Sequence, residues 1–340
     1  MRKINGQPVD AITDISDATD GTSGGEVLKW DASTGKMVWE LQDGEAYIPP
    51  VWYGDRGVIA LGGGSYLNNI DYITITTTGN AVDFGDLTVA RNGASACSDG
   101  STACFAGGRA GHPGLYNPTI DYITIATTGN ATDFGDLSVG RQAGSGLSNG
   151  TRGLFAAGNA AAGASNVIDY ITIANTGNAT DFGDLTVSVG NGLGSASNGT
   201  RGIWAGGSPS EVTIGYVTID TTGNAVDFGD LTQWRYGMTG GCTSSTRAVF
   251  GGSEISGGYD DSLDYITMAT TGNASDFGNL SVARYASGLG SNNTRGVIAG
   301  GYASAYSNVI DYITVDSLGN ATDFGDLTAN VNSLAVTSGD

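Results

Sequence analysis

Carboxylates are the side chains of this sequence best suited to acid–base or metal chemistry, and they recur at a fixed spacing. Asp83 and Asp86 lie three residues apart in an Asp-Phe-Gly-Asp motif, and Asp133 and Asp136 repeat the arrangement. Two such carboxylates could act as a glycosidase pair or bind calcium. Because the motif returns along the chain, we favour a structural role in which these carboxylates cap turns and pair with arginines, namely Arg91, Arg141, Arg235 and Arg284.

Other signals of catalysis are weak. His112 is the only histidine, so the sequence lacks the further histidines that a multi-histidine metal centre needs, and it offers one candidate at most for a histidine-based triad. The sequence has no Gly-x-Ser-x-Gly elbow and no phosphate-binding glycine loop. Cys97 and Cys104 flank an Asp-Gly turn, but Cys242 falls at the repeat position of Cys97, and we interpret all three as small buried apolar residues. We therefore predict a protein that is not an enzyme, with no catalytic residue, metal or cofactor.

The elements that carry these residues follow from a sequence repeat. The stretch 120–137, from Asp-Tyr-Ile-Thr through Thr-Gly-Asn to Asp-Phe-Gly-Asp, recurs six times in edited form at intervals of 46 to 50 residues. The phenylalanines of the copies are Phe84, Phe134, Phe182, Phe228, Phe277 and Phe324. A period near 50 built from short strands and glycine turns is typical of a β-propeller with one blade per repeat. We predict an all-β protein: a six-bladed propeller over residues 51–340, preceded by an N-terminal segment, residues 1–50.

Each repeat is expected to form four strands. In one copy these cover residues 143–148, 152–158, 168–173 and 181–187. The Tyr and Ile of the third strand and the Phe and Leu of the fourth should fill the space between blades. The end of the chain, 333–340, aligns without gaps with 93–100, the first strand of another repeat. We therefore predict that it supplies the inner strand of the blade built from 56–88 and closes the ring.

Variation in length is confined to the connection between the second and third strands. It has six residues in 65–70 and twelve in 109–120, and all six connections should emerge on one face. Loops carry binding while blades carry stability. Tyrosines beside carboxylates suit sugar rings, so we predict a ligand-binding rim, although ordinary loop residues would also explain the pattern. The rim residues are Tyr66, His112, Tyr116, Tyr259, Asp260, Asp261, Tyr302 and Tyr306.

Charge and hydropathy limit the partners. The formal net charge is −20, which repels phosphate backbones and argues against nucleic-acid binding. No apolar run approaches the ~20 residues of a membrane span. The first residues lack the apolar core of a signal peptide, so we expect synthesis in a bacterial or virus-infected cytoplasm without export.

The N-terminal segment differs in character from the repeats. Residues 24–39 predict a hairpin of two short strands, with Trp30 and Trp39 available to pair across it. A lone hairpin is marginal in water, so it should dock on another surface. The docking residues that we expect are Val27, Leu28, Trp30 and Trp39.

Two resemblances extend this interpretation. The four-stranded repeat whose second strand ends in Gly-Gly, as in 201–207 and 295–301, resembles kelch and galactose-oxidase-like propellers. The copper-binding histidines of galactose oxidase have no counterpart here, so its chemistry is not implied. Residues Gly25, Val27, Leu28, Trp30, Asp31, Gly35 and Lys36 resemble a unit of bacteriophage tail-fibre and virion appendage proteins.

These resemblances imply a virion protein, made in the host cytoplasm and located on the particle as a fibre, knob or capsid decoration. It would contact other virion proteins through residues 1–50, be oligomeric in the assembly, and display a propeller toward a host-surface glycan. The alternative is a bacterial cell-surface or secreted carbohydrate-binding propeller. A propeller hydrolase or lyase is the third class, disfavoured because no acid, base or metal cluster departs from the repeat.

Overall fold

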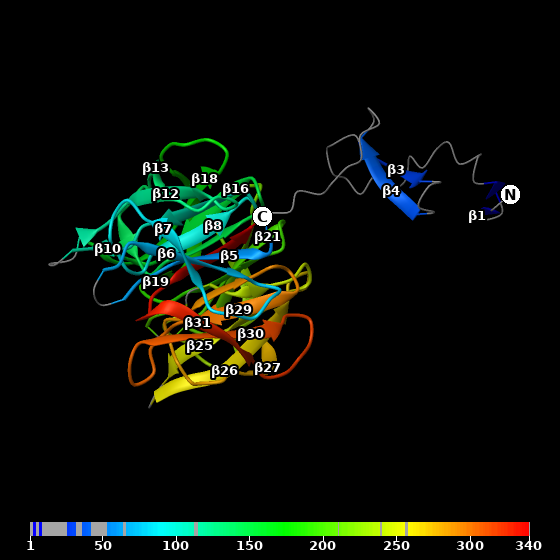
Figure 1. Cartoon of the computed structure of the whole chain (residues 1–340). Helices are drawn as coiled ribbons and strands as arrows, with labels where there is room; N and C mark the ends of the chain where they lie inside the picture. Colours follow the sequence, from blue (N-terminus) through cyan, green and yellow to red (C-terminus); the bar gives the residue numbers. More distant parts are fainter. Residues whose placement is uncertain are drawn as a thin grey trace. The chain divides into compact units, whose positions relative to one another are not determined.

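The computed structural model describes residues 53–339, apart from 64–65, 112–114, 210, 239 and 256–257, together with the backbone of four short strands nearer the N-terminus (Figure 1). The chain divides into two compact units, Met1–Pro50 and Val51–Asp340.

In the first unit, β1 (Lys3–Ile4) pairs with β2 (Gln7–Pro8), and β3 (Glu26–Asp31) forms an antiparallel hairpin with β4 (Lys36–Leu41). The register places Trp30 opposite Met37 and Trp39 opposite Leu28. The two tryptophans therefore occupy diagonal rather than directly opposed positions of the hairpin. The side chains proposed for docking, those of Val27, Leu28, Trp30 and Trp39, lie outside the described part of the chain.

The second unit is the predicted propeller, six antiparallel four-stranded blades in a ring. Blade 1 consists, from the inner to the outer strand, of β32 (Ala335–Gly339), β5 (Arg56–Ala60), β6 (Asn69–Thr74) and β7 (Val82–Asp86). Blade 2 consists of β8 (Ser95–Ser98), β9 (Thr102–Ala106), β12 (Thr119–Thr124) and β13 (Thr132–Asp136). Blade 3 consists of β15 (Ser145–Ser148), β16 (Arg152–Ala156), β18 (Gly163–Thr172) and β19 (Thr180–Val189).

The remaining blades follow the same order. Blade 4 consists of β20 (Gly194–Ser197), β21 (Arg201–Ala205), β22 (Thr213–Thr218) and β23 (Val226–Asp230). Blade 5 consists of β24 (Cys242–Thr243), β25 (Arg247–Ile255), β26 (Gly258–Thr267) and β27 (Ser275–Asn279). Blade 6 consists of β28 (Gly288–Ser291), β29 (Arg295–Ala299), β30 (Ser307–Thr314) and β31 (Thr322–Val331). Four short strands lie in connections: β10 (Arg109–Ala110), β11 (Leu115–Tyr116), β14 (Arg141–Gln142) and β17 (Asn159–Ala160).

The last strand of the chain closes the ring. β32 pairs antiparallel with β5, so that Ala335 faces Ala60 and Val336 faces Ile59. The alignment of 333–340 with an inner strand predicts this position. Because the inner strand of blade 1 comes from the C-terminus and the other three from residues 56–86, the two ends of the repeat region stabilise one sheet.

The core lies between neighbouring blades. Phe84 and Leu87 of the blade 1 side pack in one buried cluster with Phe105, Ile123 and Ile125 of blade 2. In each blade the third-strand tyrosine meets the fourth-strand phenylalanine edge to face, with ring centroids 5.9 to 6.2 Å apart. The aromatic and aliphatic residues of the repeat motif therefore fill the space between blades as predicted.

Glycines bring adjacent blades into backbone contact. A Cβ on Gly85 would collide with the carbonyl oxygen of Gly129 in blade 2, and the φ of +149° at Gly85 also favours glycine. Here the Gly129 N–H donates to the Phe84 carbonyl at 2.8 Å, and the Asp86 N–H donates to Asn130 Oδ1 at 3.1 Å. The Gly-Asn turn of each blade, preceded by Thr in five copies and by Leu in blade 6, thus covers the outer strand of the preceding blade.

Buried ion pairs join the blades a second time, but with partners other than those we expected. Arg91 contacts Asp121 at 2.9 Å, and Arg141 contacts Asp169 at 2.8 Å. The equivalent pairs are Arg235–Asp264 and Arg284–Asp311. The predicted partners, such as Asp83 and Asp133, were wrong because they lie exposed on outer strands, whereas the aspartate that begins the Asp-Tyr-Ile-Thr motif is buried beside the arginine.

The two remaining junctions lack the arginine. Between blades 3 and 4, Val189 and Gly215 occupy the two repeat positions, so the ion pair is absent as a whole. Between blades 6 and 1, Val331 replaces the arginine but Asp71 remains, only 1% exposed. Asp71 accepts hydrogen bonds from the Thr328 N–H at 2.9 Å and the Thr328 hydroxyl at 2.8 Å. Burial raises the pKa of this carboxyl, although the hydrogen bonds from Thr328 lower it.

Asp71 and Asp121 should respond oppositely to substitution by asparagine. The folded-state pKa of Asp71 is raised, so stability should fall as pH rises from the unfolded pKa of about 3.9 through the folded value. Asp71→Asn should therefore stabilise the protein at pH 7, and this gain should vanish in acid. Asp121→Asn leaves the Arg91 charge buried and should cost about 3–5 kcal/mol at pH 7. Denaturant unfolding of both variants across pH measures this; a loss of stability in Asp71→Asn at pH 7 would contradict it.

Removing the last ten residues, 331–340, should open the ring. The truncation deletes β32, exposes the unpaired edge of β5 and takes buried Leu334 out of the core. Burial of one such side chain is worth about 1.5–3 kcal/mol, and we expect Tm to fall by at least about 10 °C. The control lacks only residue 340. Equal melting temperatures for the two truncated chains would show that β32 does not hold the ring.

Candidate functional site

The propeller has two different faces. The loop face, as we call it, carries the six connections between second and third strands together with the connections that lead from one blade to the next. The turn face carries the short turns between first and second and between third and fourth strands. The chain enters the propeller on the turn face: Tyr53 lines the central cavity beside Ser98 and Ser148, and Asp55 accepts a hydrogen bond from the N–H of Thr76 at 2.8 Å.

The central cavity is small and does not suggest a ligand site. Its volume is about 90 Å³, and inner strands from all six blades line it. Serine hydroxyl groups at its wall donate hydrogen bonds to backbone carbonyls of neighbouring blades. Ser98 donates to the Ser338 carbonyl at 2.6 Å, Ser338 to the Ser291 carbonyl at 2.6 Å, and Ser291 to the Thr243 carbonyl at 2.9 Å. These bonds join the inner strands of successive blades.

The predicted rim residues do not form one site. Tyr66 and Tyr116 lie in the connections of blades 1 and 2, and His112 lies outside the described residues. Tyr259 lies in blade 5, while Tyr302 and Tyr306 lie in the connection of blade 6. Only the last three are brought together.

A cluster of five tyrosines forms where blades 5 and 6 meet on the loop face. We call it the tyrosine sector. The ring of Tyr259 stacks on Tyr285 with centroids 5.6 Å apart, and Tyr285 stacks on Tyr236 at 6.1 Å. Tyr302 meets Tyr259 and Tyr285 edge to face, both at 5.8 Å, and meets Tyr306 at 5.5 Å. The sector is therefore a continuous aromatic surface built from four separate chain segments.

Backbone hydrogen bonds fix these segments. Tyr285 and Tyr302 exchange two N–H···O bonds, of 3.0 and 2.8 Å, and the Glu254 N–H donates to the Tyr236 carbonyl at 2.9 Å. A Cβ on Gly237 would approach Tyr285 Cδ2 to 2.6 Å, so glycine is needed there for the rings to stack. The sector is thus preorganised by its connections rather than assembled from free loops.

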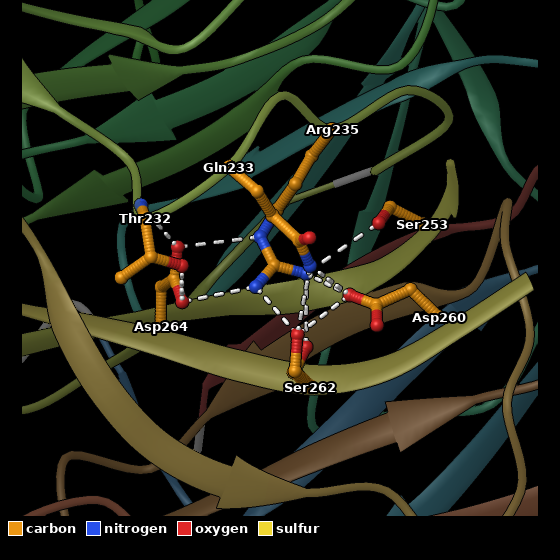
Figure 2. Close-up of polar contacts among 7 residues, drawn as sticks. All are labelled: Thr232, Gln233, Arg235, Ser253, Asp260, Ser262 and Asp264. Carbon is orange, nitrogen blue, oxygen red and sulfur yellow. Dashed lines mark hydrogen bonds and ion pairs between the residues drawn. The ribbon is translucent and has the colours of Figure 1, made fainter. Parts of the chain in front are cut away.

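Asp260 has a structural role beneath the sector. Figure 2 shows the Arg235 guanidinium surrounded by acceptors: Asp260 Oδ2 at 2.6 Å, Asp264 Oδ1 at 2.9 Å and Ser262 Oγ at 2.9 Å. Gln233 donates to the same Asp260 oxygen at 2.8 Å. This network anchors β26, which carries Tyr259, and leaves Asp260 only 9% exposed. Asp261, in contrast, is exposed.

The sector is electrostatically negative. Burial raises the pKa of Tyr236, and the charge of Glu254 raises it further. The pKa of Tyr285 is raised by the same two causes, with smaller contributions from its neighbouring tyrosines. The nearest arginines are already engaged, Arg235 by two aspartates and Arg284 by Asp311.

Tyr236 and Tyr285 were missed by sequence reasoning because they lie outside the connections of variable length. Each directly follows a repeat arginine, in the segment that leads into the next blade. The other repeats have Asn92, Gln142, Gly190 and Asn332 at this position. Comparing that one column across the repeats would have indicated an aromatic sector over two adjacent blades.

Comparison with known proteins gives no family: no protein-family model matches the chain, and no curated protein is significantly similar to it. The class that the fold defines is the six-bladed β-propeller.

Within the described residues, no group of three or more His, Cys, Asp or Glu side chains is arranged to hold a metal ion. The described part of the chain also contains no helix able to cross a membrane.

The effect of Glu254 on the sector can be measured directly. Glu254→Gln removes the charge that raises the pKa of Tyr236 and Tyr285, so both phenols should ionise at lower pH. Phenolate absorbance during alkaline titration reports this shift. Asp261→Asn, a change at an exposed carboxylate on the same hairpin, is the control and should leave the titration unchanged. Identical curves for Glu254→Gln and the parent would contradict the geometry of the sector.

Proposed function

We propose that this chain is a non-enzymatic virion structural protein, a fibre, knob or capsid decoration, that attaches through residues 1–50 and presents the loop face of its propeller to a host-surface glycan. The tyrosine sector is the observation that carries this proposal. Tyrosine supplies apolar area and a hydroxyl from one rigid side chain, which suits sugar rings. Three of its members, Tyr259, Tyr302 and Tyr306, come from the connections whose length differs between repeats, while the blades keep the same motif.

The place where the chain enters the propeller supports different roles for the two faces, attachment on the turn face and recognition on the loop face. Tyr53 and Asp55 contact the turn face, whereas the tyrosines lie on the loop face. The first described residues of the propeller therefore lie on the face opposite the sector, a polarity that suits an adhesin.

The assignment to a virion rests on the resemblance of residues 25–36 to bacteriophage appendage units and on the hairpin of β3 and β4. The proposed relationship to kelch-like propellers rests on the Gly-Gly sequence at the end of the second strands. Virion proteins would be the partners of residues 1–50, with several copies in the assembly. The second candidate, a bacterial cell-surface or secreted carbohydrate-binding propeller, shares the sector and differs only in what residues 1–50 contact.

The attachment arm is tested by comparing the full chain with a chain that begins at Tyr47. Both are mixed with virions that lack this protein, and bound protein is measured by sedimentation. We expect the full chain to bind and the shorter chain to remain free, while both keep the melting temperature of the propeller. Full-chain Trp30→Ala/Trp39→Ala, which alters the hairpin alone, should bind weakly.

Equal binding by the full and shorter chains would place the attachment surface on the propeller and contradict the role of the arm. No binding by either would remove the virion assignment and favour the bacterial-surface candidate. Adhesion to host cells should be unaffected by either change, since the loop face is intact in both.

A further inference from the structure

We infer that the tyrosine sector is the recognition site and that its ligand is an uncharged glycan, free of sialic acid, sulfate and phosphate groups. This inference rests on the proposed function, since it names the glycan class and the part of the loop face that binds it. It also narrows the predicted rim from six connections to one sector between blades 5 and 6.

Exposure and shape mark this sector as a surface for contact. Tyr259 is 38% exposed and Tyr306 is 44% exposed, although each packs against another tyrosine. Tyr285 and Tyr302 between them are half-buried and hold the outer rings in place. Rings that are fixed before binding lose little rotamer entropy on contact, which favours affinity.

The repeats show that the sector is not a requirement of the fold. Other blades place Asn, Gln or Gly where Tyr236 and Tyr285 stand, and their propeller geometry is the same. Among the connections that lead from one blade to the next, only those entering blades 5 and 6 contain a tyrosine, and they lie beside the connections that carry Tyr259, Tyr302 and Tyr306. Packing alone therefore does not account for five tyrosines in one place.

Charge decides between glycan classes. Arg235 lies between Asp260 and Asp264, at 2.6 and 2.9 Å, and Arg284 is paired with Asp311 at 3.0 Å. Glu254 adds negative charge at the sector, and among the described residues no cation forms a salt bridge with it. An acidic sugar would meet carboxylates without a guanidinium to neutralise it. Uncharged sugar hydroxyls can instead donate to Glu254 and to the phenol oxygens.

The test is a printed array that carries neutral, sialylated and sulfated glycans, probed with the full-length protein. We expect binding to neutral glycans only, with little dependence on salt because no ion pair forms. Tyr259→Ala/Tyr306→Ala should lower affinity about tenfold or more. Tyr116→Ala, a predicted rim residue in blade 2, is the matched control and should bind as the parent does.

Adhesion of the same proteins to host cells separates the proposed adhesive function from the proposal that the tyrosine sector is its site. If the parent adheres and the double variant adheres equally well, the sector is not the site, although the adhesive function stands. If acidic glycans are bound, or binding falls steeply with salt, the inference about ligand class is overturned. If the parent binds neither the array nor cells, the adhesive function and this inference fail together. Unchanged melting temperatures in the variants would show that their folds are intact.

Discussion

Backbone contact between neighbouring blades is the constraint on which the whole ring depends. The outer strand of every blade is covered by the Gly-Asn turn of the next blade, and a Cβ on the glycine of the Asp-Phe-Gly motif would collide with that turn. A Cβ on Gly325 of blade 6 would lie 2.5 Å from the carbonyl oxygen of Gly79, while the Gly79 N–H donates to Phe324 at 2.9 Å. The contact therefore runs from blade 6 back to blade 1. It satisfies part of each sheet edge that would otherwise be free to pair elsewhere.

Other contacts between blades can change because this one is constant. The buried ion pair is present at four junctions, replaced by Val189 and Gly215 at a fifth, and reduced to Asp71 at the junction that closes the ring. A charged pair that is lost as a unit is tolerated more readily than one that loses a single partner. The connections on the loop face differ between repeats even more than the ion pairs do. The tyrosine sector lies where the connections of blades 5 and 6 meet.

The fold could be predicted from the sequence because its determinants repeat. The period of the Asp-Phe-Gly motif gives the blades, and the alignment of 333–340 gives the strand that closes the ring. The partners of Arg91 and Arg141 could not be read from the sequence, because aspartates occur both on exposed outer strands and on buried third strands. The site was only partly predictable. Tyr259 and Tyr302 lie in variable connections, but Tyr285 lies in a segment of constant length and reaches them through its backbone pairing with Tyr302, so only a comparison of its position across the repeats indicates it.

We propose that the loop face recognises a ligand through the sector at blades 5 and 6, while the chain enters the propeller on the opposite face. Hydrogen–deuterium exchange of the full chain, with and without purified surface polysaccharide from host cells, tests this most directly. We expect slower exchange in 253–263 and 302–310 and around Tyr236 and Tyr285, with no change at the turns near Asp99 and Asn292. Protection at those turns, or at the connections of blades 2 and 3, would contradict it.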